Sequence, residues 1–168
     1  MERIVELCAP WSALFDHSKW ISGVVTGIHI MALLIGGGLA IATDRLTLRV
    51  AVSDPAARRA QLQEVRSVHG VVLVGLILIF LSGVLLAAAD IETFLGSPVF
   101  WTKLVFVAAL LVNGALLTRA ERRLAERADV GGWAIDDPSW ARVKLFAVAS
   151  LILWSGTAVV GIVLSNAA

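Results

Sequence analysis

A histidine stands inside an apolar segment of this sequence. His29 belongs to "TGIHIMALLIGGGLAIATDR" (residues 26–45), which contains no Asp, Glu, Lys or Arg before Asp44. An imidazole in such a segment can ligate a haem iron, hydrogen-bond a quinone or relay a proton, and it must face protein or water rather than lipid. We therefore identify His29 as a candidate site residue and haem-iron ligand. The alternative is a neutral histidine that only bonds to a neighbouring helix.

Three more polar residues are candidates for cofactor binding. Lys103 occupies the same half of the apolar region as His29, although we expect its long side chain to extend outward to the membrane surface. Asn113 is near the middle of an apolar segment, where its amide can form an interhelical hydrogen bond. His69 follows Arg66 closely, and a structural role is favoured for a histidine so near the membrane surface.

The depths of the two histidines argue against one haem shared between them. Bis-histidine haem uses imidazoles from neighbouring helices at the same depth. His29 lies about 13 Å in from Trp20 on one side, and His69 about 5 Å in from Arg66 on the other, at the rise of an α-helix. Across a hydrocarbon core of about 30 Å, roughly 12 Å separates the two rings. A shared haem is therefore disfavoured.

The composition indicates an integral membrane protein. Of the 168 residues, 58% are hydrophobic and only 16% are charged, whereas soluble domains carry about 25% charged residues. Apolar runs long enough for a membrane-spanning helix cover about 20–43, 67–89, 100–118 and 143–164. Barrel-like alternation is absent from the sequence, so the predicted fold is an all-α, four-helix membrane bundle. Residues 1–168 form a single domain in this interpretation.

The distribution of basic residues predicts the orientation. One side of the membrane receives Arg45, Arg49, Arg58, Arg59, Arg66, Arg119, Arg122, Arg123, Arg127, Arg142 and Lys144, whereas the other receives only Arg3, Lys19 and Lys103. The positive-inside rule then places both long loops in the cytoplasm and both termini outside, in a bacterial inner membrane. The net charge of +1 gives no reason to expect a nucleic-acid partner.

Residues 1–19 are predicted to form a short helix in the outer membrane interface. Apolar residues recur there at helical spacing, and Pro10 should kink this helix or mark its start. The expected interface anchors are Trp11, Trp20, Trp101 and Arg45.

Helix starts and glycines add detail to this architecture. Asp-Pro pairs at 54–55 and 137–138 resemble an N-cap followed by a first helical residue, so the second and fourth helices should begin there. The two pairs occupy equivalent places in two helical hairpins, which weakly indicates an internal repeat in which residues 20–90 correspond to residues 100–165. The "GGG" run at 36–38 and the pair Gly23 and Gly27 are typical of close helix packing.

Two stretches carry a resemblance to known membrane proteins. "IHIMALLIGGGLAIATDRL" and "LSGVLLAAADIETFLGSPVFWTKLVFVAALLVNG" resemble a family of small bacterial four-helix membrane proteins. The shared positions are His29, Asp44, Arg45, Phe100, Lys103, Leu104 and Asn113. More distantly, the chain is similar to HemJ-type protoporphyrinogen oxidases and b-type membrane cytochromes. That similarity implies haem b as the cofactor and points to His29 and Lys103 as residues that hold it.

Three functions are compatible with the sequence. The favoured one is an accessory or scaffold subunit of a larger membrane complex, or a homo-oligomer, without chemistry of its own. Close behind is a redox protein that binds haem b or a quinone around His29. Transport of a small solute or proton ranks last, because few polar residues lie in the middle of the spans. The sequence contains no soluble-enzyme motif, so an enzyme is not the favoured class.

Overall fold

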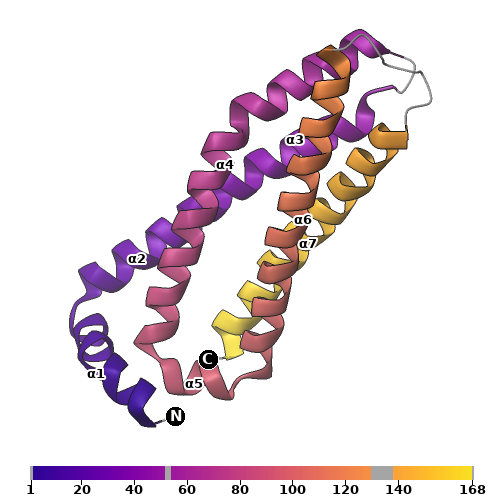
Figure 1. Ribbon diagram of the computed structural model, residues 1–168. Helices are drawn as coiled ribbons and strands as arrows, with labels where there is room; N and C mark the ends of the chain where they lie inside the picture. The colour runs from indigo at the N-terminus through magenta and orange to yellow at the C-terminus, as the bar shows by residue number, and fades with distance from the viewer. Residues whose placement is uncertain (1, 52–53, 130–137, 168) are drawn as a thin grey trace.

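A computed structural model describes residues 2–51, 54–129 and 138–167, and every element in these ranges is helical (Figure 1). Four helices in the described residues are long and apolar enough to cross a membrane: Lys19–Arg49, Pro55–Ala89, Pro98–Leu124 and Ser139–Leu164. The predicted all-α, four-helix membrane architecture is thus confirmed. The helices extend beyond the predicted spans at one end, because their polar continuations keep a helical backbone outside the apolar segment.

The first long helix is made of three consecutive segments. It consists of α2 (Lys19–Ala32), a π-helical segment η1 (Leu33–Gly37) and α3 (Gly38–Arg49). Ser18 caps its start by accepting a hydrogen bond from the Ile21 amide at 3.4 Å. The sequence pattern did not predict the π-helical turn. It coincides with the glycine run, where missing side chains leave room for the wider turn.

The predicted start of the second span is confirmed in detail. Helix α4 (Pro55–Ala89) has Asp54 as its N-cap, and the Asp54 carboxylate accepts a hydrogen bond from the Ala57 amide at 3.0 Å. Pro55 occupies the first turn, where its missing N–H costs nothing. Helix α7 (Pro138–Ala167) also begins at the predicted proline. Its predicted cap, Asp137, lies outside the described residues.

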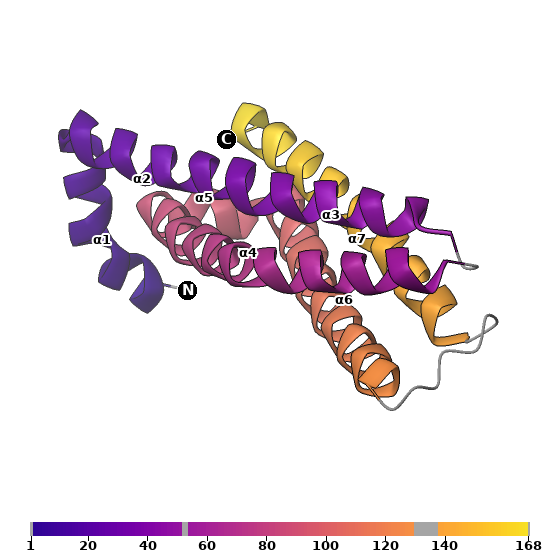
Figure 2. The ribbon, with the colours of Figure 1, turned by 90° about the horizontal axis from the view of Figure 1, so that it is seen from above.

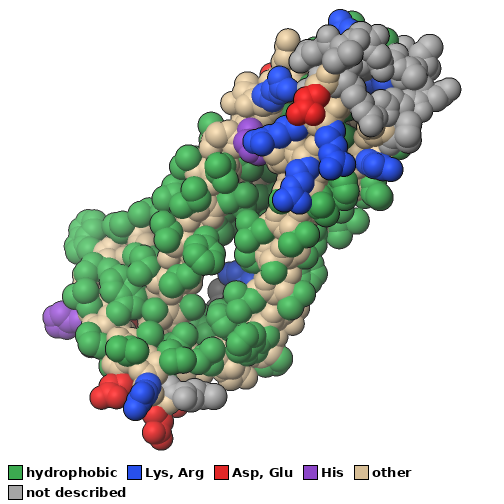
Figure 3. Space-filling view, viewed as in Figure 1, with side chains coloured by type: hydrophobic (Ala, Val, Ile, Leu, Met, Phe, Trp, Pro, Cys, Tyr) green, Lys and Arg blue, Asp and Glu red, His purple; other side chains and the backbone are tan. Residues whose placement is uncertain are grey.

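The bundle is closed on three sides and open on the fourth. Helix α6 (Pro98–Asp129) packs along α7, α3 packs against α7, and α2 with η1 packs against α4. Helices α4 and α6 make few contacts with each other and diverge toward the end that carries both termini (Figure 1). Figure 3 shows a hollow between the helices on this side, with mainly hydrophobic side chains around it.

The two ends of the bundle differ in chemistry. Basic side chains gather at one end, which we call the arginine-rich end, whereas both termini lie at the opposite end (Figures 1 and 3). A small buried core of Leu62, Leu124, Trp140 and Val143 holds the helices together at the arginine-rich end. Between the ends, many large apolar side chains are exposed, for example Phe80 at 59%. A lipid bilayer would cover this surface.

At the end with the termini, α1 (Glu2–His17) lies at one side of the bundle, beside α2 and the last turns of α4, and hydrogen bonds join it to α4 (Figure 2). The Trp11 indole donates to the Leu85 carbonyl at 2.8 Å, and the Ser12 hydroxyl donates to the Ala89 carbonyl at 2.6 Å. Both carbonyls belong to the last turns of α4. Pro10 lies inside α1 rather than at its start. The short helix α5 (Ile91–Gly96) then leads into α6.

Candidate functional site

His29 faces α4 and not the lipid side of its own helix. Its Nδ1 atom lies 2.9 Å from the Ser82 hydroxyl oxygen. A methyl group at Gly83 would come 3.5 Å from the His29 Cε1 atom, which is ordinary contact. The ring therefore occupies a shallow space that the Ser82–Gly83 pair leaves on α4.

One tautomer of His29 satisfies every hydrogen bond around Ser82. In it, the Ser82 hydroxyl donates its one hydrogen to carbonyls one turn earlier on α4, principally that of Leu78. Its oxygen then accepts from His29, and Nδ1 carries the proton. In a neutral imidazole the other nitrogen, Nε2, keeps a free lone pair. His29 thus offers a hydrogen-bond acceptor, or a metal ligand, on the side away from Ser82.

Lys103 approaches the same region from α6. Its Nζ atom lies 3.6 Å from the place that a methyl group on Gly161 of α7 would occupy, so the missing side chain of Gly161 makes room for the ammonium. The ammonium is also within electrostatic range of the His29 ring. The ammonium therefore lies against α7, whereas the sequence led us to expect it to extend outward to the membrane surface.

The described residues do not fit a bis-histidine haem. His29 could supply one axial nitrogen, but Ser82 beside it is roughly 20 Å along α4 from His69. This separation is larger than the sequence estimate, because the bond to Ser82 fixes the level of His29 on α4. No group of three or more His, Cys, Asp or Glu side chains is placed to hold a metal ion within the described part of the chain. We derive no chemistry through a haem.

Asn113 connects two helices. Its side-chain amide donates a hydrogen bond to the Phe146 carbonyl of α7 at 3.0 Å, and the side chain is buried. A polar group that satisfies its donor in this way fixes the packing of α6 on α7. The structure does not bring Asn113 into contact with His29.

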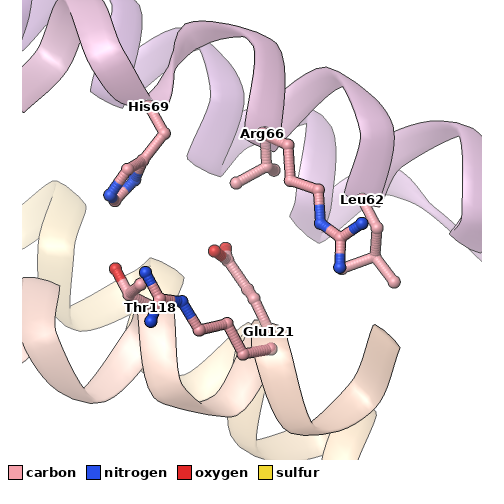
Figure 4. Close-up of a pocket in the computed structure, with 7 residues that line it drawn as sticks. Leu62, Arg66, His69, Thr118 and Glu121 are labelled. Carbon is pink, nitrogen blue, oxygen red and sulfur yellow. The ribbon is translucent and has the colours of Figure 1, made fainter. Parts of the chain in front are cut away.

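His69 belongs to a different site at the arginine-rich end. It lines a cavity of about 340 Å³ between α4 and α6, together with Arg66, Thr118, Glu121 and Arg122 (Figure 4). This cavity is open to the side of the bundle.

The four predicted interface anchors have different environments. Trp20 is 85% exposed and Arg45 is also exposed, in agreement with contact to a membrane surface. Trp101 is 51% exposed and donates a hydrogen bond to the Leu95 carbonyl at 3.0 Å. Trp11 instead uses its indole to hold α1 on α4.

Sequence reasoning missed several polar residues that position the helices. Ser82 is a hydroxyl within an otherwise apolar run, and this isolation was the available signal. Asp44 is only 6% exposed and hydrogen-bonds Ser150, while Glu121 lies within electrostatic range of Asp44. Nearby, the Gln61 amide donates to the Thr47 hydroxyl at 3.0 Å and to a backbone carbonyl of α3. These contacts join helices far apart in sequence, so spacing alone could not reveal them.

Comparison of the chain with protein-family models, with curated proteins and with solved structures finds no significant match.

Proposed function

We propose that this chain is a multi-pass protein of a bacterial cytoplasmic membrane that binds a quinol between α4 and α6. The observation that carries the proposal is that His29, which bonds Ser82 of α4, and Lys103 of α6 lie within electrostatic range of each other. By the positive-inside rule, the arginine-rich end faces the cytoplasm and both termini lie outside. The hollow then opens toward the acyl chains of the bilayer, where membrane quinones dissolve.

The two side chains match the oxygen atoms of a quinol. The free Nε2 of His29 accepts a hydrogen bond, and a quinol hydroxyl donates one. The ammonium of Lys103 donates to the second quinol oxygen as a charge-assisted bond. An oxidised quinone has no hydroxyl that could donate to Nε2 of His29, so it can form only the hydrogen bond with Lys103. The arrangement therefore favours the reduced form of the ligand.

The proposal is tested with ubiquinol-1, kept reduced without oxygen, and the detergent-solubilised full chain. We expect saturable retention above that of protein-free micelles, and weaker retention of ubiquinone-1. His29→Leu and Lys103→Met should each lower the affinity about tenfold or more, since a hydrogen bond to a charged or buried partner contributes about 1.5 kcal/mol or more. The controls are His17→Leu and Lys19→Met, which change the same residue types in exposed positions.

Two results would contradict this function. Equal retention by the His29 variant and the His17 control would remove His29 from the site. A Soret absorption band in the purified protein, lost in His29→Ala, would replace the quinol with a haem.

A second candidate function is an accessory subunit of a larger membrane complex. Methyl groups at Gly23 and Gly27 would meet nothing within 4 Å, so these small residues do not pack against another helix of the chain. Such a face suits a partner helix, either from another subunit or from a second copy. If so, Gly23→Leu combined with Gly27→Leu should release the chain from a complex isolated in mild detergent. The control Gly70→Leu, which is equally unobstructed, should not.

A further inference from the structure

The cavity at the arginine-rich end takes no part in the proposed quinol site. It has a volume of about 340 Å³ and lies between the first part of α4 and the last part of α6. Figure 4 shows that the side chains of His69 and Glu121 point into the space between the two helices. The cavity is roughly 20 Å along α4 from the residues that hold His29.

The cavity offers donors for a phosphate group. Arg66 enters its lining from α4 and Arg122 from α6, so two guanidinium groups border the same space. Guanidinium forms paired hydrogen bonds with phosphate oxygens, which makes arginine the usual residue for this recognition. His69 can add a neutral N–H donor from its exposed ring.

The cavity also offers acceptors, which a phosphodiester without hydroxyl groups would not use. The Thr118 hydroxyl donates its hydrogen to the Gly114 carbonyl at 2.9 Å, so its oxygen can only accept from a ligand. The Glu121 carboxylate is a second acceptor. Two guanidinium groups and one carboxylate leave one positive charge, which suits a singly charged anion that carries hydroxyl groups.

An apolar surface continues from the cavity toward the centre of the bundle. On α4, Leu73 and Phe80 follow His69 on the same helical face and are 50% and 59% exposed. On α6, Leu111 precedes Thr118 by two turns and is 47% exposed. These side chains can lie against acyl chains in the bilayer. A water-soluble phosphate would leave this surface unused.

We propose that this cavity binds the headgroup of an anionic phospholipid whose phosphodiester carries a hydroxylated alcohol, as in phosphatidylglycerol. The phosphodiester lies between Arg66 and Arg122, and the headgroup hydroxyls donate to Glu121 and Thr118. The acyl chains follow the apolar side chains of α4 and α6. Basic pockets between membrane-spanning helices are suited to such headgroups.

The test measures the affinity of the delipidated full chain in neutral micelles for added phosphatidylglycerol, phosphatidylcholine and inorganic phosphate, by native mass spectrometry. We expect saturable binding of phosphatidylglycerol, at least about tenfold tighter than that of phosphatidylcholine. Arg66→Gln combined with Arg122→Gln should lower the affinity for phosphatidylglycerol about tenfold or more. Arg119→Gln combined with Arg142→Gln removes the same charge from exposed positions outside the cavity, and should change the affinity less than about threefold.

A second variant, Val65→Phe, keeps every charge but fills the cavity, and it too should abolish the preference for phosphatidylglycerol. Helix content and elution volume check that each variant is folded. Equal weakening by the two arginine pairs, or undiminished binding in Val65→Phe, would overturn the site. If inorganic phosphate displaced phosphatidylglycerol and bound with the same affinity, the assignment of a lipid as the ligand would be overturned.

Discussion

The contact between Gly36 and Gly75 gives the sharpest test of how the helices pack. A methyl group on Gly75 would lie 2.9 Å from the Cα atom of Gly36 and 3.4 Å from the Ala32 carbonyl oxygen. Carbon atoms in contact are normally about 3.5–4.0 Å apart, so Gly75→Ala must push η1 and α4 apart by roughly 0.5–1 Å. Both obstacles are backbone atoms, and no side-chain rotation can relieve the clash.

Overpacking of this kind costs about 1–3 kcal/mol. For a chain of this size, each kcal/mol shifts the melting temperature by about 2–4 °C. The control is Gly70→Ala on the same helix, where a methyl group meets nothing within 4 Å and gains the same helix propensity. We therefore expect Gly75→Ala to melt about 6 °C below Gly70→Ala when both are followed by circular dichroism in detergent at one scan rate. Equal midpoints would refute the close approach of the two helices.

Three further variants test other contacts. Gly37→Ala places a methyl group 3.0 Å from the indole of Trp154 and should destabilise the protein by about 1–3 kcal/mol. The control Gly38→Ala, where a methyl group meets nothing within 4 Å, should not destabilise it. Equal melting midpoints of the two variants would contradict this contact. Asn113→Leu removes the 3.0 Å hydrogen bond to α7 and should cost about 0.6 kcal/mol, and at most about 1.7, in the same assay. Trp11→Phe removes the 2.8 Å bond from α1 to α4, so amide hydrogens of α1 should exchange faster, while Trp20→Phe, at an 85% exposed position, leaves them unchanged.

The parts of the fold that depend on local sequence were predictable. Four apolar runs of sufficient length indicate four helices, because a backbone in hydrocarbon must satisfy its own hydrogen bonds. The Asp54 cap and the Pro55 start follow from the chemistry of helix ends. The separation of His29 and His69 also followed from helix rise alone, although the actual distance is larger than the estimate.

The remaining features depend on contacts between helices that one sequence cannot give. The π-helical turn forms where Gly36 meets Gly75 and Gly37 meets Trp154, and neither partner is near in sequence. The bond from His29 to Ser82 spans 53 residues. Glycines also differ in role although they look alike in the sequence, since Gly23 and Gly27 resemble packing residues but a methyl group at either would meet nothing within 4 Å.

The central claim is that His29 presents an unprotonated Nε2 toward a ligand between α4 and α6. Nitrogen-15 NMR of protein labelled in its three histidines tests this most directly, with His29→Gln to assign the signal. We expect a neutral ring with the proton on Nδ1, and a shift of the Nε2 signal when ubiquinol-1 is added. A proton on Nε2, or a signal that ubiquinol-1 does not change, would contradict it.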